Sequence, residues 1–436
     1  MKKRNSLLVF LLLSLVQLQA QVEPAAGQWK TWFIPSGKSH RLLPPQPNAT
    51  EGQLVLTQQQ QITAASRLDM QHFNAGAPGY RWQELMHDTW MSDTNNTGAL
   101  ANMLLAVATY DATIVAWDTK YTYNRQRPFQ ADSKIKLLVP DPASPSYPCE
   151  YSVAAGVAVT IFSHFFPAMA DSVQVMARKT MHARIAAGVA YPTDTEAGFE
   201  LGKKIAVLEI EATKNYAPSK SSKVPRPNDP ALWQGDPSFS QAGLGKTIVL
   251  EKSSQFRPGP PPDFAKDMAE LKSFKPNFRS TANAFFFASQ SFWEDQLEKK
   301  IFEYNLHLNP PRAARIYAIT NIGMYDGFTA CWDAKFTYWG TRPDQYDTTF
   351  KPVLFFTPPF PGYPSGHAML GQVMAELYAY FFPAEKDYFY KKAKDAAESR
   401  FQGGIHFRTD NEVGLEMGKK VGGAIIVRVK KDGAGE

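Results

Sequence analysis

The chain has 436 residues, of which 44% are hydrophobic and 20% are charged, and it contains two cysteines. This composition excludes a disordered chain and a fibrous repeat, and the length suits two or three domains or one large duplicated fold. The formal net charge of +6 falls to +3 without the first twenty residues, and the remaining Lys and Arg are scattered. We therefore expect no nucleic-acid-binding surface.

Residues 1–20 have the pattern of a signal peptide. Basic residues occupy positions 2–4, an apolar run extends from Leu7 to Val16, and Ala20 stands before the expected cleavage point. The run is too short for an uncleaved anchor, and we expect no other apolar stretch of spanning length. The sequence thus predicts an exported protein, periplasmic or secreted, without stable membrane insertion.

Three segments of the first half recur in the same order in the second half. The pairs, offset by 215 or 216 positions, are residues 110–128 with 325–343, 147–167 with 363–383, and 183–204 with 399–420. Agreement in order and in spacing predicts two homologous halves.

The repeated segments carry apolar residues at three- and four-residue spacing, whereas strand signals are sparse. The expected helices are 100–117, 152–166, 312–332 and 368–381. We therefore predict an all-α fold of two tandem homologous helical bundles related by a pseudo-twofold axis. The predicted organisation is a signal peptide at 1–20, an N-terminal bundle at 21–215, a Pro-rich linker without long helices at 216–277 and a C-terminal bundle at 278–436.

The second half alone carries a complete set of convergent polar residues. The set is Lys335, Arg342, Ser365, Gly366, His367, Ser399, Arg400 and His406. The first half keeps three of the cations, which we interpret as relic or structural residues. It has other residues in place of the Ser-Gly-His sequence and in place of His406. These first-half residues are Lys120, Arg127, Arg184, Cys149, Glu150, Tyr151 and Ala190. Loss of both histidines from a half that keeps its helices indicates that they serve chemistry in the other half.

Three cations on separate helices suit a tetrahedral or trigonal oxyanion such as phosphate or vanadate. Gly366 permits close backbone approach, and the helix beginning near His367 directs N–H groups and its positive dipole end toward the anion. His367 can act as an acid and base, and His406 as a nucleophile toward phosphorus or a ligand of a metal oxyanion. Asp410, four residues after His406, can fix its tautomer.

The motifs K-x6-RP, PSGH and SR-x5-H occur without a mismatch at residues 335–343, 364–367 and 399–406. The chain therefore resembles the superfamily of type 2 phosphatidate phosphatases (PAP2), nonspecific bacterial acid phosphatases and vanadium-dependent haloperoxidases. The resemblance implies that His406 binds vanadium or attacks phosphorus, and that His367 is the acid and base. It further implies that the oxyanion is held by Lys335, Arg342, Ser365, Gly366 and Arg400.

Within this superfamily the chain most resembles the bacterial vanadium-dependent haloperoxidases, which have two bundles and Ala after PSGH. Trp332 and Phe360 match aromatic residues of the halide and peroxide pocket in those enzymes, although core packing and loop anchoring remain alternative roles. Asp410 recurs in the first half as Asp194, so a structural role also remains open for it.

The resemblance implies an enzyme with a vanadate cofactor that oxidises halide with hydrogen peroxide. The alternative is an exported acid phosphatase, without cofactor, that uses His406 as a phosphohistidine nucleophile. In either case the partners are small molecules. The sequence leaves open the halide, the physiological substrate, the oligomeric state and the pairing of Cys149 with Cys331.

Overall fold

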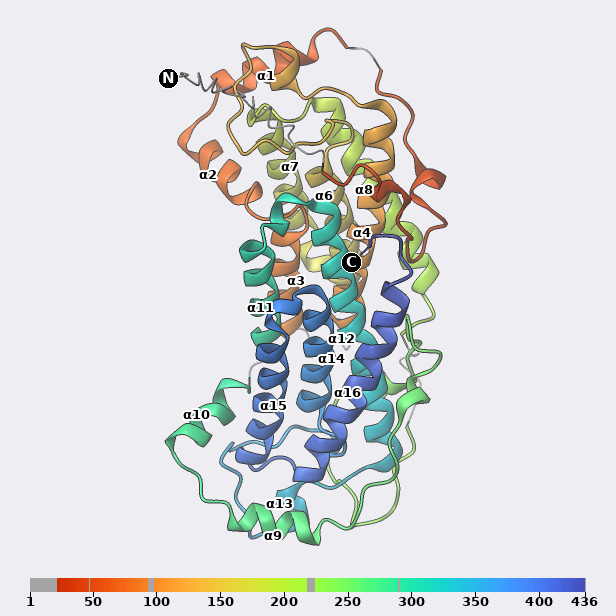
Figure 1. Ribbon diagram of the computed structural model, residues 1–436, viewed down its shortest axis with the longest axis vertical. Helices are drawn as coiled ribbons and strands as arrows, with labels where there is room; N and C mark the ends of the chain where they lie inside the picture. The colour runs from red at the N-terminus through yellow and green to blue at the C-terminus, as the bar shows by residue number, and fades with distance from the viewer. Residues whose placement is uncertain (1–21, 47, 93–97, 218–223, 289–290, 436) are drawn as a thin grey trace, which may run out of the picture.

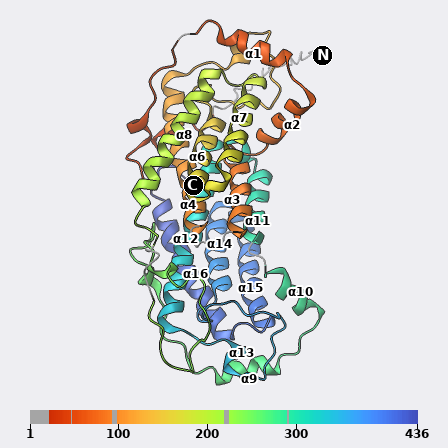
Figure 2. The same ribbon diagram turned by 180° about the vertical axis from the view of Figure 1, so that it is seen from behind.

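The computed structural model describes residues 22–46, 48–92, 98–217, 224–288 and 291–435. The predicted signal peptide lies outside these residues. The described residues form helices and loops without a strand, which confirms the predicted all-α fold. Two bundles lie end to end along the long axis of the molecule, and the views from both sides show the same order (Figure 1, Figure 2).

Four long helices dominate each bundle among the described residues. They are α4 (Gly98–Tyr123), α6 (Glu150–Phe165), α7 (Ala170–Ala186) and α8 (Pro192–Thr213) in the first bundle, and α12 (Pro310–Tyr338), α14 (Gly366–Phe381), α15 (Lys386–Gln402) and α16 (Arg408–Val429) in the second. Corresponding helices have matched lengths: 16 residues in α6 and α14, 17 in α7 and α15, and 22 in α8 and α16. The four helices predicted from periodicity coincide with α4, α6, α12 and α14.

Shorter helices cover the ends and sides of the two bundles. They are α1 (Glu51–Gln60), α2 (Ala64–Phe73), α3 (Tyr80–Ser92), α5 (Pro128–Ala131), α9 (Ala265–Ser273), α10 (Phe278–Phe286), α11 (Ser291–Glu303) and α13 (Pro343–Tyr346). α9 and α13 lie at the far end of the second bundle (Figure 1). Cys149 and Cys331 are both buried and free, so the question of their pairing is answered in favour of two thiols.

The central helices α4 and α12 pack against each other and join the two bundles. α4 is apolar around its whole circumference and is buried along nearly its entire length, as expected for a helix without a solvent face. The segment Gly98–Ala131 is long and apolar enough to cross a membrane, so the expectation that no other stretch reaches this length is wrong. However, 94% of its most apolar part is buried inside the protein, which makes it the core helix of the bundle.

An irregular strap crosses the central helix of each bundle and is fixed there by a buried aspartate. In the first bundle, the Asp111 carboxylate accepts the backbone N–H groups of residues 32–33 at 2.9–3.0 Å. In the second bundle, the Asp326 carboxylate accepts those of residues 248–250 at 2.7–3.0 Å. Both aspartates have no exposed surface. The correspondence between the two bundles therefore includes a segment that the sequence repeats did not reveal.

The second strap belongs to the predicted linker, which lies along the second bundle. No helix in the described part of residues 216–277 is longer than the nine residues of α9. Gly243 rests on the backbone of Asp333, where a Cβ would come within 2.3 Å of the amide nitrogen. The Phe239 ring meets Trp332 edge to face at 6.3 Å. This segment thus supports the helix turn that carries the cations described next.

Candidate active site

The structure brings the three signature motifs together at the end of the second bundle. Lys335 lies in the last turn of α12, and Arg342 directly precedes α13. Ser365 caps the N-terminus of α14, and Arg400 lies in the last turn of α15. His406 follows in the loop before α16. Residues up to 71 positions apart in the sequence therefore meet at one place, as the motifs predicted.

The chain reaches this place by a sharp turn at the end of α12. Trp339 has a left-handed backbone, with φ of 50°, and its N–H closes the helix on the Lys335 carbonyl at 2.8 Å. A left-handed backbone costs a non-glycine residue about 1–2 kcal/mol. The Trp339 side chain offsets this cost by burial, packing on Trp233 and Phe336. The turn brings Arg342 back beside Lys335.

Lys335 is completely buried and forms no ion pair among the described residues. Its ammonium group donates to the carbonyl oxygens of Pro361 and Gly362 at 2.7 and 2.8 Å. Burial lowers the pKa of Lys335 to about 7, and the nearby charge of Arg342 adds to this effect. Two carbonyl oxygens do not neutralise a cation, so an anion bound beside Lys335 would favour its charged form.

Arg342 is also completely buried and spans the site. Its Nε and Nη2 atoms each donate to the Phe360 carbonyl at 3.1 Å, and Nη1 donates to the Ile405 carbonyl at 2.7 Å. Nη1 also lies 2.9 Å from His406 Nε2. Burial lowers the pKa of Arg342 to about 10, so the guanidinium remains charged at neutral pH. Arg342 thereby ties the loop before α14 to the loop before α16.

Arg400 completes the set of cations and is only 2% exposed. It donates to the hydroxyl of Ser399 at 2.9 Å and to the carbonyl of Ala284 at 2.8 Å. Burial, followed by the charge of Arg342, lowers its pKa to about 10. Within the described parts of the chain, no carboxylate lies within ion-pair distance of Lys335, Arg342 or Arg400. Because Lys335, Arg342 and Arg400 belong to the second bundle, we call these three residues the second cage.

The N-terminus of α14 faces this cage. Ser365 caps the helix by accepting the Ala368 N–H at 3.4 Å, and the first N–H groups of the helix have no partner within it. A Cβ built on Gly366 would lie 3.5 Å from the Trp332 ring and 3.9 Å from Lys335 Cε, in ordinary contact. Gly366 also lines the pocket beside the cage, so the N-terminus of α14 is accessible to an anion in that pocket.

His406 is held in one orientation by Asp410. Its Nδ1 atom lies 2.9 Å from the carboxylate, which also accepts the N–H of Phe407 at 3.1 Å. Burial lowers the pKa of His406 well below its usual value, and the charges of Arg342 and Lys335 act in the same direction. The Nδ1–H group therefore donates to Asp410, and Nε2 is left as a lone pair directed toward Arg342.

His367 has a different environment, because its Nε2 atom is buried without a hydrogen-bond partner among the described residues. Burial lowers its pKa well below the usual value, and Arg400, Arg342 and Lys335 lower it further. The imidazole is therefore neutral at neutral pH and has a free polar atom beside the cage. A buried polar atom without a partner is rare in proteins, and His367 lines the pocket beside the cage.

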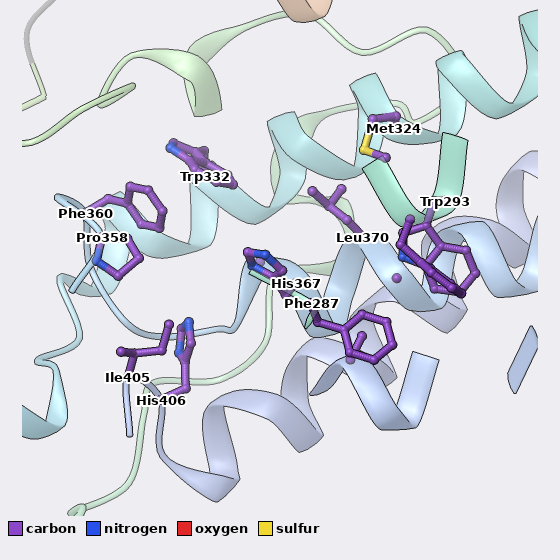
Figure 3. A pocket seen from close by; sticks show the side chains of 14 residues that line it. Phe287, Trp293, Met324, Trp332, Pro358, Phe360, His367, Leu370, Ile405 and His406 are labelled. Atoms are coloured by element: carbon purple, nitrogen blue, oxygen red, sulfur yellow. The ribbon is translucent and has the colours of Figure 1, made fainter. Parts of the chain in front are cut away.

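Both histidines line one pocket, which encloses about 660 Å³ including its mouth. Figure 3 shows His367 between an end that contains His406 and Phe360 and an apolar end that contains Trp293 and Leu370. Trp332 and Phe360 lie 5.1 Å apart and each faces the Lys335 ammonium, at 5.8 and 5.4 Å. The two predicted aromatic residues thus pack against each other and also form the pocket wall beside the cage.

The apolar end of this pocket was not predicted from the sequence. It is formed by Phe287, Phe292, Trp293, Met324 and Leu370. The first three come from the aromatic-rich segment 285–293, which has no place in the three motifs. Arg400 donates to the carbonyl of Ala284, directly before this segment, so the cage and the apolar wall are physically connected. In the sequence, only the density of aromatic residues around position 287 could have indicated this apolar wall.

Comparisons with known proteins agree with this architecture. The PAP2 superfamily model matches residues 98–216, and the model of the VCPO second helical-bundle domain matches residues 386–433. The resemblance to the PAP2 and vanadium haloperoxidase superfamily is confirmed. The PAP2 match covers the first bundle, which lacks both histidines. No match was found among curated proteins.

Solved structures of bacterial vanadium-dependent haloperoxidases have the same fold. The structure of the first bacterial vanadium-dependent iodoperoxidase is 18% identical with a TM-score of 0.58, and the alignment covers 88% of this chain and 97% of that one. A holo-type bacterial vanadium-dependent chloroperoxidase is 14% identical with a TM-score of 0.59, with 79% and 93% covered. The apo-type chloroperoxidase gives 14% identity, a TM-score of 0.58, and 78% and 95% coverage.

Asp410→Asn is expected to weaken anion binding without unfolding the protein. The amide cannot hold the Nδ1–H of His406 as a carboxylate does, and loss of such an outer partner typically costs about 10–100-fold in affinity or activity. Equilibrium binding of orthovanadate and the melting temperature would be measured together. Unchanged vanadate affinity in a folded variant would show that Asp410 only caps α16, as Asp194 caps α8.

Proposed function

We propose that this chain is a vanadate-dependent haloperoxidase that oxidises halide ions with hydrogen peroxide. The observation that carries this proposal is the second cage, in which three buried cations without a carboxylate partner surround the N-terminus of α14. Such a site requires a tetrahedral or trigonal anion from outside the chain. The neighbouring pocket is lined mostly by apolar side chains, as suits small substrates such as a halide and hydrogen peroxide.

Vanadate fits the donor set of this site. The cage and the free N–H groups of α14 suit its oxygens, and the lone pair of His406 Nε2 suits vanadium. When bound, vanadate supplies a Lewis acid that activates peroxide without a change in its oxidation state. The residues that would hold it are Lys335, Arg342, Arg400, Ser365 and Gly366 around the oxygens and His406 at vanadium.

The protein side chains then have separate tasks. Neutral His367 can take a proton from hydrogen peroxide and return it to the leaving oxygen, because its Nε2 atom is free. Lys335 stabilises negative charge that develops on oxygen at the floor of the pocket. Trp332 and Phe360 exclude water beside Lys335, which strengthens this electrostatic contribution.

The alternative function is an acid phosphatase, for which His406 Nε2 is oriented equally well to attack phosphorus. Both functions use the same cage, since vanadate resembles the transition state of phosphoryl transfer. We further propose export to the periplasm or the medium, on the strength of the leader pattern in residues 1–20. The two functions differ in the substrate that is turned over.

The deciding experiment uses protein freed of phosphate and metal ions and then reloaded with orthovanadate. We expect peroxide-dependent oxidation of iodide, which is easier to oxidise than bromide, and inhibition by inorganic phosphate. Bromide is tested next to define the halide range. No halide oxidation, combined with vanadate-inhibited hydrolysis of a phosphomonoester, would reject the haloperoxidase and establish the phosphatase.

Lys335→Met is expected to lower kcat by about 10²–10³-fold, as does removal of one donor from an oxyanion hole. Its matched control is Lys120→Met, because Lys120 is the equivalent, equally buried lysine of the first bundle. The control should keep its turnover and lose only thermal stability, since it breaks a buried ion pair with Glu150. Equal losses of kcat in the two variants would contradict a specific role for Lys335.

A further inference from the structure

The first bundle contains a second group of three buried cations, here called the first cage, formed by Lys120, Arg127 and Arg184. Their exposed fractions are 0%, 0% and 2%, so they are as deeply buried as the residues of the second cage. They occupy the equivalent positions of the repeat, at the ends of α4 and α7 and before α5. Unlike the second cage, however, the first cage contains a carboxylate.

That carboxylate belongs to Glu150, on which all three cations converge. Lys120 Nζ lies 2.8 Å from Oε2, and Arg127 and Arg184 lie 3.3 and 3.2 Å from Oε1. Burial alone would raise the pKa of Glu150, but the charges of Arg127, Lys120 and Arg184 outweigh it and hold that pKa well below its usual range. Glu150 is therefore a permanent anion within the first cage.

Glu150 is the counterpart of Gly366, because each is the first residue of its helix and the two positions differ by the repeat offset of 216. In the second bundle, Gly366 lines the pocket beside the cage, and a Cβ there would be in ordinary contact with Trp332 and Lys335. A glutamate side chain at the same position in the first bundle extends into the corresponding space. The first cage thus holds a carboxylate at the position that a glycine occupies beside the pocket of the second cage.

The first cage also borders a cavity. Glu150, Tyr151 and Arg184 line a pocket of about 830 Å³ including its mouth, together with Asn74 and His307. The second cage is reached in the same way, through a pocket at the N-terminus of α14. A small anion could therefore reach the first cage if its carboxylate were removed.

We propose that the first bundle is an oxyanion-binding site that is occupied by its own chain. The Glu150 carboxylate takes the position of the external oxyanion, and its removal opens a second site for inorganic phosphate or a similar tetrahedral anion. This inference goes beyond the proposed function, because it depends only on the charges and geometry of the first bundle. It also explains why three cations persist there without the two histidines.

The test is Glu150→Gly in the full chain, which restores the residue found in the second cage. Binding of inorganic phosphate is measured by equilibrium dialysis, and the melting temperature is measured with and without phosphate. We expect one additional phosphate per chain relative to the parent and a melting temperature that rises with phosphate more steeply than the parent's. A folded variant without this additional site overturns the proposal.

Two further variants separate the anion site from general destabilisation. Glu51→Gln removes another buried carboxylate of the first bundle, the partner of Arg125, and should gain no phosphate site. Glu150→Gln removes the charge but still fills the space, and should bind less phosphate than Glu150→Gly. If Glu150→Gly is not recovered folded, refolding is compared with and without phosphate. Recovery with phosphate only supports the proposal, and failure in both overturns it.

The reciprocal variant, Gly366→Glu, places a carboxylate in the second cage. We expect it to lose phosphate and vanadate binding while its melting temperature stays level or rises, because the new side chain neutralises the cage. Retained binding, or lost binding with a lower melting temperature, counts against the proposal. This arm uses anion binding by the second cage and so rests on the proposed function, whereas the Glu150→Gly arm does not.

Discussion

His406→Ala is expected to abolish vanadate-dependent halide oxidation, with a loss of at least about 10³-fold in kcat/KM. Its Nε2 atom is the only imidazole lone pair that the described structure places next to an arginine of the second cage. The variant should also lose most of its affinity for vanadate, because no other described side chain offers nitrogen at this position. Iodide oxidation and equilibrium vanadate binding measure the two effects independently.

The matched control for this variant is His164→Ala. His164 lies near the end of α6, the counterpart of α14, and is exposed, so its removal should change neither vanadate affinity nor turnover. The melting temperature of His164→Ala should remain close to that of the parent, whereas His406→Ala should melt lower, because it removes a buried ring that bonds Asp410 and Arg342. Parent-like turnover in folded His406→Ala would reject the assignment of this residue.

The polar part of the site could be predicted from the sequence because its residues lie in short motifs. Each motif lies at the end of a helix, so the spacing of its residues along the chain determines where their side chains lie in space. Lys335 and Arg342 flank one turn, Ser365 and His367 flank the start of α14, and the structure brings all of them together. Local sequence therefore contained most of the information needed for the second cage.

The apolar wall and the straps could not be predicted in the same way. The strap at residues 248–250 is fixed through backbone N–H groups by Asp326, and backbone hydrogen bonds place little constraint on side-chain identity. Likewise, Phe287 and Trp293 join the pocket through tertiary packing, which periodicity does not specify. These elements are conspicuous only once the two bundles are compared in space.

The role of Glu150 was also missed, although the residue stood in the compared motifs. Sequence comparison showed only that the Ser-Gly-His sequence was lost from the first half. The structure shows that Lys120, Arg127 and Arg184 converge on the Glu150 carboxylate, which by our proposal takes the place of an external anion. A buried cation without a counter-charge is costly, so the cations of the first cage and the Glu150 carboxylate must be considered together.

His367→Ala is expected to lower kcat by about 10²–10⁴-fold, the usual contribution of a general acid and base. Vanadate affinity should change much less than in His406→Ala, because the His367 Nε2 atom forms no hydrogen bond to the described residues of the cage. The pair of variants therefore separates proton transfer from cofactor binding. Turnover is measured with saturating vanadate, and binding is measured in the absence of peroxide.

Tyr151→Phe is the control for this variant, because Tyr151 occupies the equivalent position in the first bundle. Its hydroxyl donates to the Gly76 carbonyl at 2.8 Å, so the change removes one hydrogen bond far from the second cage. We expect unaltered turnover in this control. If His367→Ala instead lost vanadate affinity and turnover in equal proportion, His367 would be a positioning residue for the anion and the proton transfer would belong to another group.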